Sequence, residues 1–484
     1  MPVETKLLIE MSVPGRGRRD YLPESDVPET SLDEYQDLIR NKDSLILPDV
    51  AESDAIRHFE YLGSLNYSID RGVYPLGSCT MKYNPRVNET LANLPGFTHL
   101  HPNQPMETVQ GALQVMYELQ RYLAEITGMY AVSLDPKAGA HGELTGILMI
   151  KKYHESRGEG AKRRKILIPD SAHGTNPATA AMADYEEVTL PSDINGNVNL
   201  DELRKLMTEK VAGIMMTLPS TLGLFDPNIL EITQIVHEKG GLVYGDGANQ
   251  NATMGKAKFG ELGFDVVHLN LHKTFSTPHG GGGPGAGPVA CKEHLAPFLP
   301  SPIVEKMDDS YLFIKPDNTI GKIGEYYGNF AMVVRAYAYI RAHGEEGLRS
   351  VSEYAVLNAN YLLSLLQDDY YLKFKRRCMH EFVLSGIRQK AKNVSTMDIV
   401  KRLMDYGFHP PTVYFPQKQI VPEALMIEPT ETESKDSLDA FAKALIAINK
   451  EVDENPEIVR TAPHTTQIGR PDESSASRNP DIHW

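Results

Sequence analysis

The sequence predicts an α/β protein with a mostly parallel sheet, helices on both faces of that sheet, and a smaller C-terminal α+β domain. Two observations support this prediction. Short apolar runs alternate with helix-like stretches through the middle of the chain, and after about residue 330 helical patterns dominate over short strands. Strands that are apolar throughout are typical of parallel sheets buried on both faces. A chain of 484 residues is long enough for two or three domains.

The strands of the sheet are predicted from apolar runs in the middle of the chain. Helix-like stretches separate these runs, for example at 200–208 and 228–239. Ligands of such sheets bind beyond the carboxyl ends of the strands, so the residues that close each run are candidate site residues. The runs are Lys165 to Asp170, Ala212 to Leu218, Gly241 to Asp246 and Asp265 to Asn270.

The helices are predicted from apolar spacing and from the residues at their ends. Between Val109 and Ile126, apolar residues recur every three or four positions, and Gly128 supplies a stop. Similar patterns predict helices over 351–366, over 395–406 with Ser395 as cap and Gly407 as stop, and over 437–448. A short strand is expected from Thr412 to Pro416.

These patterns divide the chain into three predicted parts. Residues 1–105 form an N-terminal arm with loops, 106–335 the large cofactor-binding domain, and 336–484 a small C-terminal domain with an irregular tail. The arm contains two segments expected to be ordered loops, 74–85 and 99–105. Because it has too little periodicity to make a core of its own, we expect it to pack on another part or on a partner.

Composition narrows the functional class. Apolar residues make up 41% of the chain and charged residues 23%, which is ordinary for a globular protein. The formal charge of −15 makes a surface for nucleic acid unexpected. Three cysteines form neither a CxxC pair nor an even disulfide framework. Apolar stretches are too short for a membrane span, and no targeting segment is recognised, so a cytoplasmic enzyme is expected.

Asp246 and Lys273 are the central candidates for chemistry. Asp246 ends one predicted strand, and Lys273 follows the end of the next, so both side chains are expected at the same edge of the sheet. Pyridoxal phosphate needs a lysine amine for a Schiff base and a carboxylate that keeps its pyridine nitrogen protonated. The alternative is that Asp246 caps a turn and Lys273 is a solvated loop residue.

The neighbours of these two residues favour the cofactor interpretation. Asn270 and His272 flank Lys273 in the segment NLHK, and both are expected to donate hydrogen bonds to a phosphate. His173 follows another predicted strand, where a neutral imidazole could lie flat on the pyridine ring. Its alternative is an exposed residue in a helix N-terminal turn capped by Ser171 or Thr175.

Two weaker candidates lie at other turns. Backbone N–H groups of Gly139, Ala140, His141 and Gly142 could point at an anion at the start of a helix, although an ordinary tight turn explains the same residues. At the end of a further strand, the hydroxyl of Ser220 or Thr221 could reach the cofactor ring or its phosphate.

Other motifs do not lead to a different chemistry. Gly280, Gly282 and Gly285 satisfy a GxGxxG pattern, but a strand follows them, whereas a dinucleotide fingerprint must open a helix. The run HGGGGPG lacks the GxSxG nucleophile elbow of hydrolases, so we expect these glycines to allow close backbone approach beside a cofactor. His99 and His101 lack further ligands for a metal. Cys79 has no paired base and is expected to be a buried small residue.

Long segments of the chain resemble the glycine decarboxylase, or P-protein, family of the glycine cleavage system. The resemblance rests on LLIEMSVPGR, LNYSIDRGVYPLGSCTMKYNPR, AGAHGELTGILMIKKYHESRG, IPDSAHGTNPATA, GDGANQNA, NLHKTFSTPHGGGGPGAGP and FHPPTVYFP. These segments run from residue 7 to beyond residue 416. Within the family, the chain resembles the catalytic second subunit of the two-chain form. The resemblance implies a type I pyridoxal-phosphate fold with a seven-stranded sheet.

The resemblance also implies roles for single residues. Lys273 would carry the cofactor, Asp246 would pair with the pyridine nitrogen, and Ala248 would pack on the ring. His173 would stack on the ring, while Asn270 and His272 would contact the phosphate. The implied reaction is decarboxylation of glycine and transfer of the aminomethyl group to the lipoyl arm of H-protein.

The implied partners follow from the length of the chain. Single-chain members of the family are about twice as long, so a first subunit without the cofactor lysine is expected, in pairs that dimerise again to a heterotetramer. The loops at 74–82, with Cys79 and His101 nearby, are expected to line the path of the lipoyl group. The alternatives are another type I pyridoxal-phosphate decarboxylase or aminotransferase, and a non-catalytic scaffold subunit.

Overall fold

The structure is a computed structural model, and it describes residues 6–17, 26–28, 30–39, 47–276, 285–416 and 418–480. The chain forms two compact units. The first comprises Met1–Arg71 and Thr466–Trp484, and its described helices are η1 (Asp33–Leu38), α1 (Glu52–Leu65) and α14 (Glu473–Arg478). The second comprises Gly72–Thr465 and contains every strand of the described residues. Among the described residues, no helix combines the length and apolar character needed to cross a membrane.

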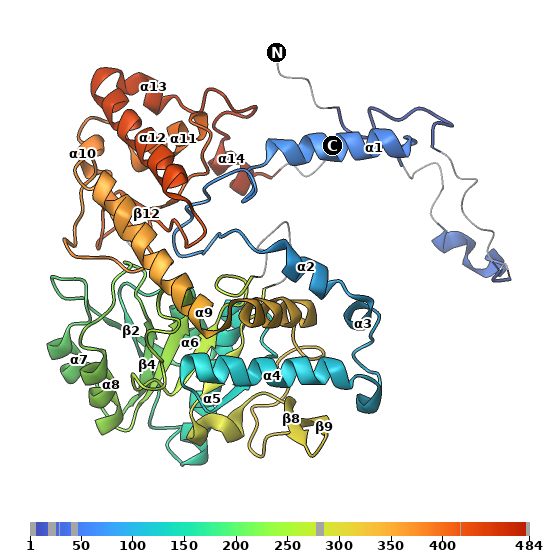
Figure 1. The fold of residues 1–484 in the computed structure, drawn as a ribbon, viewed down its shortest axis with the longest axis vertical. Coiled ribbons are helices and arrows are strands. Elements are labelled where there is room, and N and C mark those ends of the chain that lie inside the picture. Colours follow the sequence, from blue (N-terminus) through green and yellow to red (C-terminus); the bar gives the residue numbers. More distant parts are fainter. Residues whose placement is uncertain are drawn as a thin grey trace. The chain divides into compact units, whose positions relative to one another are not determined.

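A seven-stranded sheet forms the centre of the second unit (Figure 1), which confirms the predicted α/β class. Its order is β1-β7-β6-β5-β4-β2-β3. Strands β6, β5, β4, β2 and β3 run parallel to one another, and β7 is antiparallel to both β6 and β1. The bounds are β1 Ala131–Ser133, β2 Lys165–Pro169, β3 Glu186–Leu190, β4 Val211–Thr217, β5 Leu242–Gly247, β6 Val266–Leu269 and β7 Val289–Cys291.

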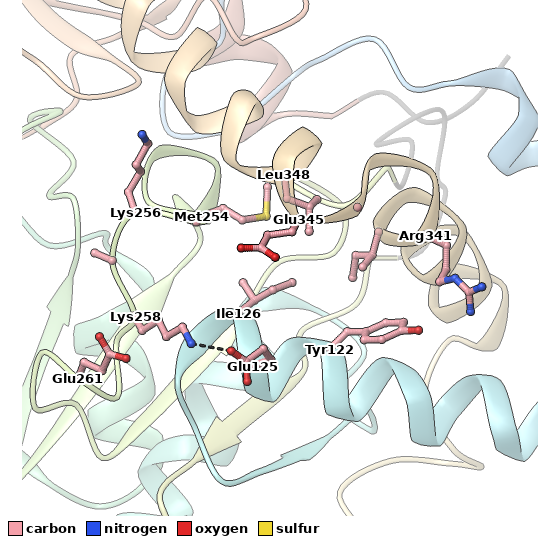
Figure 2. A pocket seen from close by; sticks show the side chains of 14 residues that line it. Tyr122, Glu125, Ile126, Met254, Lys256, Lys258, Glu261, Arg341, Glu345 and Leu348 are labelled. Atoms are coloured by element: carbon pink, nitrogen blue, oxygen red, sulfur yellow. Dashed lines mark hydrogen bonds and ion pairs between the residues drawn. The ribbon is translucent and has the colours of Figure 1, made fainter.

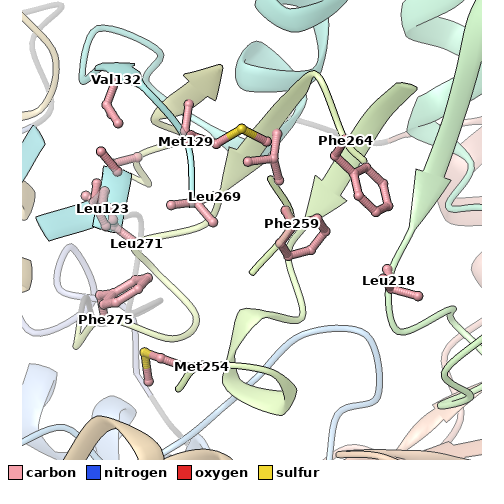
Figure 3. Packing of buried hydrophobic residues seen from close by; sticks show 14 of the residues in the cluster. Leu123, Met129, Val132, Leu218, Met254, Phe259, Phe264, Leu269, Leu271 and Phe275 are labelled. Atoms are coloured by element: carbon pink, nitrogen blue, oxygen red, sulfur yellow. The ribbon is translucent and has the colours of Figure 1, made fainter. Parts of the chain in front are cut away.

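Helices cover both faces of the sheet, because successive side chains of each strand point to opposite sides. Along β2, Leu167 joins one hydrophobic cluster while Ile166 and Ile168 join another. The first cluster includes aromatic side chains such as Phe259 and Phe264, whose ring centroids lie 4.9 Å apart (Figure 3). The helices of this part are α4 Gln110–Thr127, α5 Gly139–Ser156, α6 Thr175–Met182, α7 Leu200–Leu206, α8 Ile229–Glu238 and the long α9 Phe330–Leu366.

Local sequence explains where several helices begin and end. Helix α4 ends at Gly128, whose φ of 67° lies in the left-handed region that glycine adopts without strain, as predicted. Helix α11 (Thr396–Asp405) begins at Ser395, which forms a capping box with Asp398, also as predicted. Helix α9 begins earlier than the predicted 351 and changes direction at Gly344, where φ is 60°.

A second sheet of three strands forms the smaller part of the second unit. Its order is β10-β12-β11, with bounds Phe382–Ser385, Ala424–Ile427 and Thr412–Val413. The strand predicted from Thr412 to Pro416 therefore ends after two residues, because Tyr414 adopts a φ of 58° and leaves the extended conformation. Helices α10 Ile387–Lys390, α12 Lys435–Glu454 and α13 Pro456–Arg460 complete this part, and α12 is longer than the predicted 437–448.

Two further features were not predicted. A two-stranded hairpin comprises β8 (Ile303–Met307) and β9 (Ser310–Ile314), and short helices α2 (Arg86–Ala92) and α3 (Pro95–Thr98) interrupt the predicted arm. Segment 74–85 has no helix or long strand, in keeping with the predicted ordered loop. The predicted boundaries after residues 105 and 335 remain predictions, and the second of them lies inside α9.

Candidate active site

Asp246 lies near the carboxyl end of β5, on the central part of the sheet, and its side chain is buried. Its Oδ1 accepts the backbone N–H of Ala248 at 3.0 Å. Longer contacts join its Oδ2 to Nδ2 of Asn176 at 3.4 Å and to the hydroxyl of Thr217 at 3.5 Å. Three groups from three separate elements therefore orient the carboxylate.

The charge of Asp246 is stabilised by its surroundings. Burial alone would raise the pKa of this carboxyl, but His268, Lys273 and the N–H of Ala248 together lower it below its ordinary value. Nε2 of His268, on the adjacent strand β6, lies 3.5 Å from Oδ1 of Asp246. Asp246 is therefore an ionised carboxylate at neutral pH, as a partner for a protonated ring nitrogen must be.

Sequence reasoning did not identify His268 as a site residue. It is buried, and Nδ1 lies 2.5 Å from the hydroxyl of Tyr244 on β5. Burial lowers the pKa of His268, which keeps the imidazole neutral. A signal was present in the sequence, because His268 stands two positions before Asn270 and so shares its face of the strand.

Glu143 was also missed. This buried residue of α5 accepts hydrogen bonds from the hydroxyl of Thr175 at 2.7 Å and of Thr179 at 3.3 Å. Burial and the charge of Asp246 raise the pKa of Glu143 to about 7. No sequence pattern distinguishes Glu143, since a glutamate on a helix is usually solvated.

His173 lies in the turn after β2, as predicted. Its Nδ1 lies 2.9 Å from the hydroxyl of Thr175 and also accepts the backbone N–H of that residue at 3.3 Å. Burial lowers its pKa, while the charge of Asp246 acts in the opposite direction. His173 is half-buried, and its ring lies 5.5 Å from that of Phe415. His173 is therefore not merely exposed, and neither Ser171 nor Thr175 caps α6, whose N-cap residue is Gly174 without a side-chain cap.

Lys273 follows β6 and lies within range of the charges of Asp246, Glu143 and His173. Its Nζ donates a hydrogen bond of 2.8 Å to the backbone carbonyl of Ser78. The lysine and the aspartate thus share the carboxyl edge of the sheet, as their positions in the sequence predict.

Asn270 and Gly139 approach each other closely at the start of α5. A Cβ atom placed on Gly139 would lie 2.5 Å from Oδ1 of Asn270. Asn270 is buried, and this oxygen accepts no hydrogen bond from any described residue. Ala140 and His141 follow in the first turn of α5, where Nδ1 of His141 accepts the backbone N–H of Lys137 at 3.2 Å.

His272 contacts a residue further along the chain. Its Nδ1 lies 3.2 Å from both the N–H and the carbonyl oxygen of Ala286, and burial together with the charge of Lys273 lowers its pKa to about 4. His272 is therefore neutral at neutral pH. The interpretation of Gly280 and Gly282 concerns residues outside those described, and only Gly285 of that pattern can be placed, against the ring of His272.

Two other predicted residues have local partners. The hydroxyl of Thr221 donates to the backbone carbonyl of Ser171, and the side chain is buried. Ala248 is buried, directly after β5, and its N–H donates to Asp246. Whether Thr221, Ala248, Gly139, Ala140 and His141 contact a cofactor stays a prediction.

The residues at this edge of the sheet fit pyridoxal phosphate. Asp246 receives one short hydrogen bond and two long contacts, which leaves its carboxylate available to a charged N–H donor. Oδ1 of Asn176 and Oδ1 of Asn270 are buried and without hydrogen-bond donors among the described residues. Such groups are costly unless a ligand or water completes them.

Within the part of the chain that the structure describes, two clusters of buried acids and histidines have potential ligand atoms within 4.8 Å of one another. One comprises Glu143, Asp246 and His268, and the other comprises His380, Glu381 and Glu428. His99 and His101 belong to neither cluster, and Nδ1 of His101 accepts the N–H of Asn103 at 3.1 Å.

Cys79 differs from its prediction as a buried small residue. It is half-buried, and its thiol lies in the field of Lys273, Glu428 and Glu381. Burial raises the pKa of the thiol despite the opposing charge of Lys273. Cys79 is therefore a neutral thiol beside the candidate cofactor lysine.

A separate hollow of about 610 Å³ lies between α4, the loop after β5 and α9. Figure 2 shows that Lys258 and Glu125 form an ion pair across it, at 2.6 Å, with Met254 and Leu348 nearby. It contains none of the predicted site residues, so it is distinct from the site at the edge of the sheet.

Comparisons with known proteins agree on one family. Residues 14–311 match the model of the glycine cleavage system P-protein, and residues 351–465 match that of the glycine dehydrogenase C-terminal domain. A probable glycine dehydrogenase (decarboxylating) subunit 2 from Caldanaerobacter subterraneus is 56% identical over 483 residues, covering 99% of this chain and 98% of the relative. Its counterpart from Listeria innocua is 54% identical, with coverage of 99% and 98%.

Solved structures show the same fold. A crystal structure of a glycine decarboxylase (P-protein) of the glycine cleavage system, in inhibitor-bound form, superimposes with a TM-score of 0.70 at 21% identity. The match covers 90% of this chain and 93% of that one. A glutamate decarboxylase from Lactobacillus brevis reaches a TM-score of 0.65 at 14% identity, covering 90% and 96%.

Proposed function

The chain belongs to the glycine cleavage system P-protein family, and we propose that its Lys273 binds pyridoxal phosphate covalently while Asp246 holds the proton of the pyridine nitrogen. The activity is that of a glycine dehydrogenase (decarboxylating), a pyridoxal-phosphate-dependent enzyme. The observation that carries the assignment of residues is the placement of an ionised, buried Asp246 and an amine at one edge of the sheet.

When bound, pyridoxal phosphate supplies an electron sink for the electron pair that glycine retains as its carboxylate leaves as carbon dioxide. Asp246 favours this by keeping a positive charge on the ring nitrogen. His268 and Ala248 hold the carboxylate in place, and the neutral state of His268 leaves the Asp246 charge uncancelled. His173 is proposed to pack on the ring face.

The phosphate is proposed to lie near the start of α5. Backbone N–H groups at a helix N-terminus attract anions, and Gly139 allows Asn270 to come close there. Asn270 provides a side-chain amide that donates to phosphate oxygens. His272 is neutral and contacts Ala286 through Nδ1, so its proposed contribution is a single hydrogen bond through Nε2.

The designation of the relatives as subunit 2 implies a partner subunit for this chain as well. We assign the partner to the first subunit of the P-protein, in αβ pairs that form a heterotetramer. The acceptor of the aminomethyl group is proposed to be the lipoyl arm of H-protein, whose disulfide would enter beside segment 74–82. The half-buried Cys79 supports an open side of the site at that segment.

The decisive test of the cofactor site is chemical trapping. The complex of this chain with its first subunit is loaded with pyridoxal phosphate, reduced with borohydride, digested and analysed by mass spectrometry. The modified peptide should carry the cofactor on Lys273. Modification of a different lysine, or of none, would refute the assignment.

Substrate identity needs a second test. Carboxyl-labelled glycine should release labelled carbon dioxide in the presence of lipoylated H-protein. Release from a larger amino acid and none from glycine would instead indicate another type I decarboxylase.

A further inference from the structure

Three glutamates with buried side chains, at or near the ends of strands of the smaller sheet, bind residues of segment 78–82 through hydrogen bonds and an ion pair. The N–H of Ser78 donates to Oε2 of Glu381 at 2.6 Å, and the hydroxyl of Thr80 donates to Oε1 of Glu428. Lys82, itself buried, pairs with Glu431 at 3.2 Å. The backbone N–H of Ser78 and the side chains of Thr80 and Lys82 thus each supply one partner to a glutamate.

Two of these glutamates face each other directly. Strands β10 and β12 pair with Phe382 opposite Ile427, so Glu381 precedes the first strand where Glu428 follows the second. Both side chains are completely buried, and their oxygens lie within 4.8 Å of each other and of His380. Oε1 of Glu381 and Oε2 of Glu428 receive no hydrogen bond from the described residues. Like charges placed opposite each other in a sheet are destabilising.

One proton held between Glu381 and Glu428 removes the repulsion between two negative charges. Two buried carboxyl groups at such a separation cannot both ionise readily, and one retains its proton. Burial, and then the charge of Glu428, raise the pKa of Glu381 well above its ordinary value. Burial raises the pKa of Glu428 to about 7, although Thr80, Lys273 and Asn251 act against this.

Several other groups face this pair. His380 lies 3.5 Å from Glu381, and burial lowers its pKa to about 3, so it is neutral. Asn251 donates to Oε1 of Glu428 at 3.1 Å, and the charge of Glu431 acts on Glu428. The thiol of Cys79 is neutral. Lys273 is therefore the cation whose charge acts on both members of the pair.

Ser78 joins the pair to the lysine. Its N–H binds Glu381 and its carbonyl accepts Nζ of Lys273 at 2.8 Å. The φ of Ser78 is 64°, a left-handed conformation that a non-glycine residue adopts only when its surroundings impose it. This conformation directs the two polar groups of one residue to Glu381 and to Lys273.

We propose that Glu381 and Glu428 share one proton, and that the negative charge left on the pair holds the ammonium group of Lys273 on the Ser78 carbonyl whenever this lysine is not linked to the cofactor. The inference rests on the proposed role of Lys273. Glu381 and Glu428 are positioning residues in this view, because they act on Lys273 through charge and through Ser78.

The test measures how fast pyridoxal phosphate links to Lys273 at different pH values. The complex with the first subunit is prepared without cofactor, and linkage is followed by absorbance from about pH 6 to about pH 10. Only the neutral amine reacts, so the midpoint of the profile reports how strongly the site holds the ammonium form. In the double variant E381Q/E428Q, the midpoint should move to lower pH by about one unit or more.

The single variants give a sharper expectation. When either glutamate becomes glutamine, the remaining carboxyl loses its competitor and ionises, so one negative charge persists. E381Q and E428Q should therefore each shift the midpoint far less than half of the double-variant shift. E431Q is the matched control, since Glu431 pairs with Lys82 of segment 78–82 and belongs to neither position of the pair. A double-variant profile equal to wild type, or two additive single shifts, would overturn the proposal.

An infrared measurement covers the case in which the double variant does not fold. Above about pH 8, wild type should retain the C=O band of one buried protonated carboxyl, and both E381Q and E428Q should lose it. E431Q should keep the band, and its absence from wild type would refute proton sharing. The band does not depend on the cofactor. Failure to trap pyridoxal phosphate on Lys273 would therefore refute the proposed function separately.

Discussion

Oδ1 of Asp246 lies 3.5 Å from Nε2 of His268, a neutral histidine on the neighbouring strand. Because burial lowers the pKa of His268, its imidazole is neutral and contacts the carboxylate without cancelling the negative charge. The negative charge of Asp246 therefore remains available to a cation bound at the edge of the sheet.

Replacement of Lys273 should abolish covalent binding of the cofactor. In K273A, borohydride should fix no pyridoxal phosphate on the chain, and carbon dioxide release should fall at least about 100-fold, since acid–base contributions alone reach that size. Absorbance of the linked cofactor and labelled glycine provide the readouts. K256A, which removes an exposed lysine paired with Glu353, should keep both properties. Normal labelling of K273A would contradict the assignment.

Replacement of Asp246 by asparagine should preserve the shape of the site but remove its charge. Loss of one such electrostatic group costs about 3 kcal/mol, so decarboxylation by D246N should be roughly 100-fold slower. The rate with saturating pyridoxal phosphate separates this effect from weak cofactor binding. D170N serves as a control, since Asp170 also ends a strand but binds Ser192 instead. Equal rates for D246N and wild type would exclude the proposed role.

A methyl group at Gly139 should disturb the phosphate end of the site. The new Cβ would meet Oδ1 of Asn270 at 2.5 Å, a distance at which one of the two must move. Affinity for pyridoxal phosphate, measured by titration, should fall about tenfold, equivalent to about 1.4 kcal/mol. G111A places a methyl on helix α4 with nothing within 4 Å and should leave affinity unchanged. Equal affinities would place the phosphate elsewhere.

Acidification should destabilise the fold in part through His272. Its pKa falls from an ordinary 6.5 to about 4, so between these values the unfolded chain binds more protons than the folded one. This contribution to stability is complete above about pH 6.5 and decreases as the pH falls toward 4, by at most about 3 kcal/mol. Urea unfolding at several pH values should show a weaker pH dependence for H272N than for wild type. H99N, at an exposed histidine, should behave as wild type, and identical slopes for all three would disprove this contribution.

The sequence predicted the frame of the site because its signals are local. Apolar runs placed the ends of β5 and β6, and these ends position Asp246 and Lys273. His268 was not predicted as a site residue because it lies within an apolar run, where a histidine is usually a core residue. The proximity of Glu381 and Glu428 was not predicted because it depends on the register of two antiparallel strands that are distant in sequence. This register is set by tertiary packing and produces no periodic pattern in the sequence.

Helix α9 contributes side chains to two hydrophobic clusters, from Met332 to Val351 in one and from Ala359 to Leu366 in the other. Beyond the bend at Gly344, the part of α9 from Leu348 to Leu366 still contributes to both clusters, so the stability of each core depends on the other. If the smaller sheet unfolds, the end of α9 loses its packing, and the helix can no longer support the larger core. Residues 72–465 should therefore melt in one cooperative transition, in which the active-site lysine and its glutamate pair are lost together.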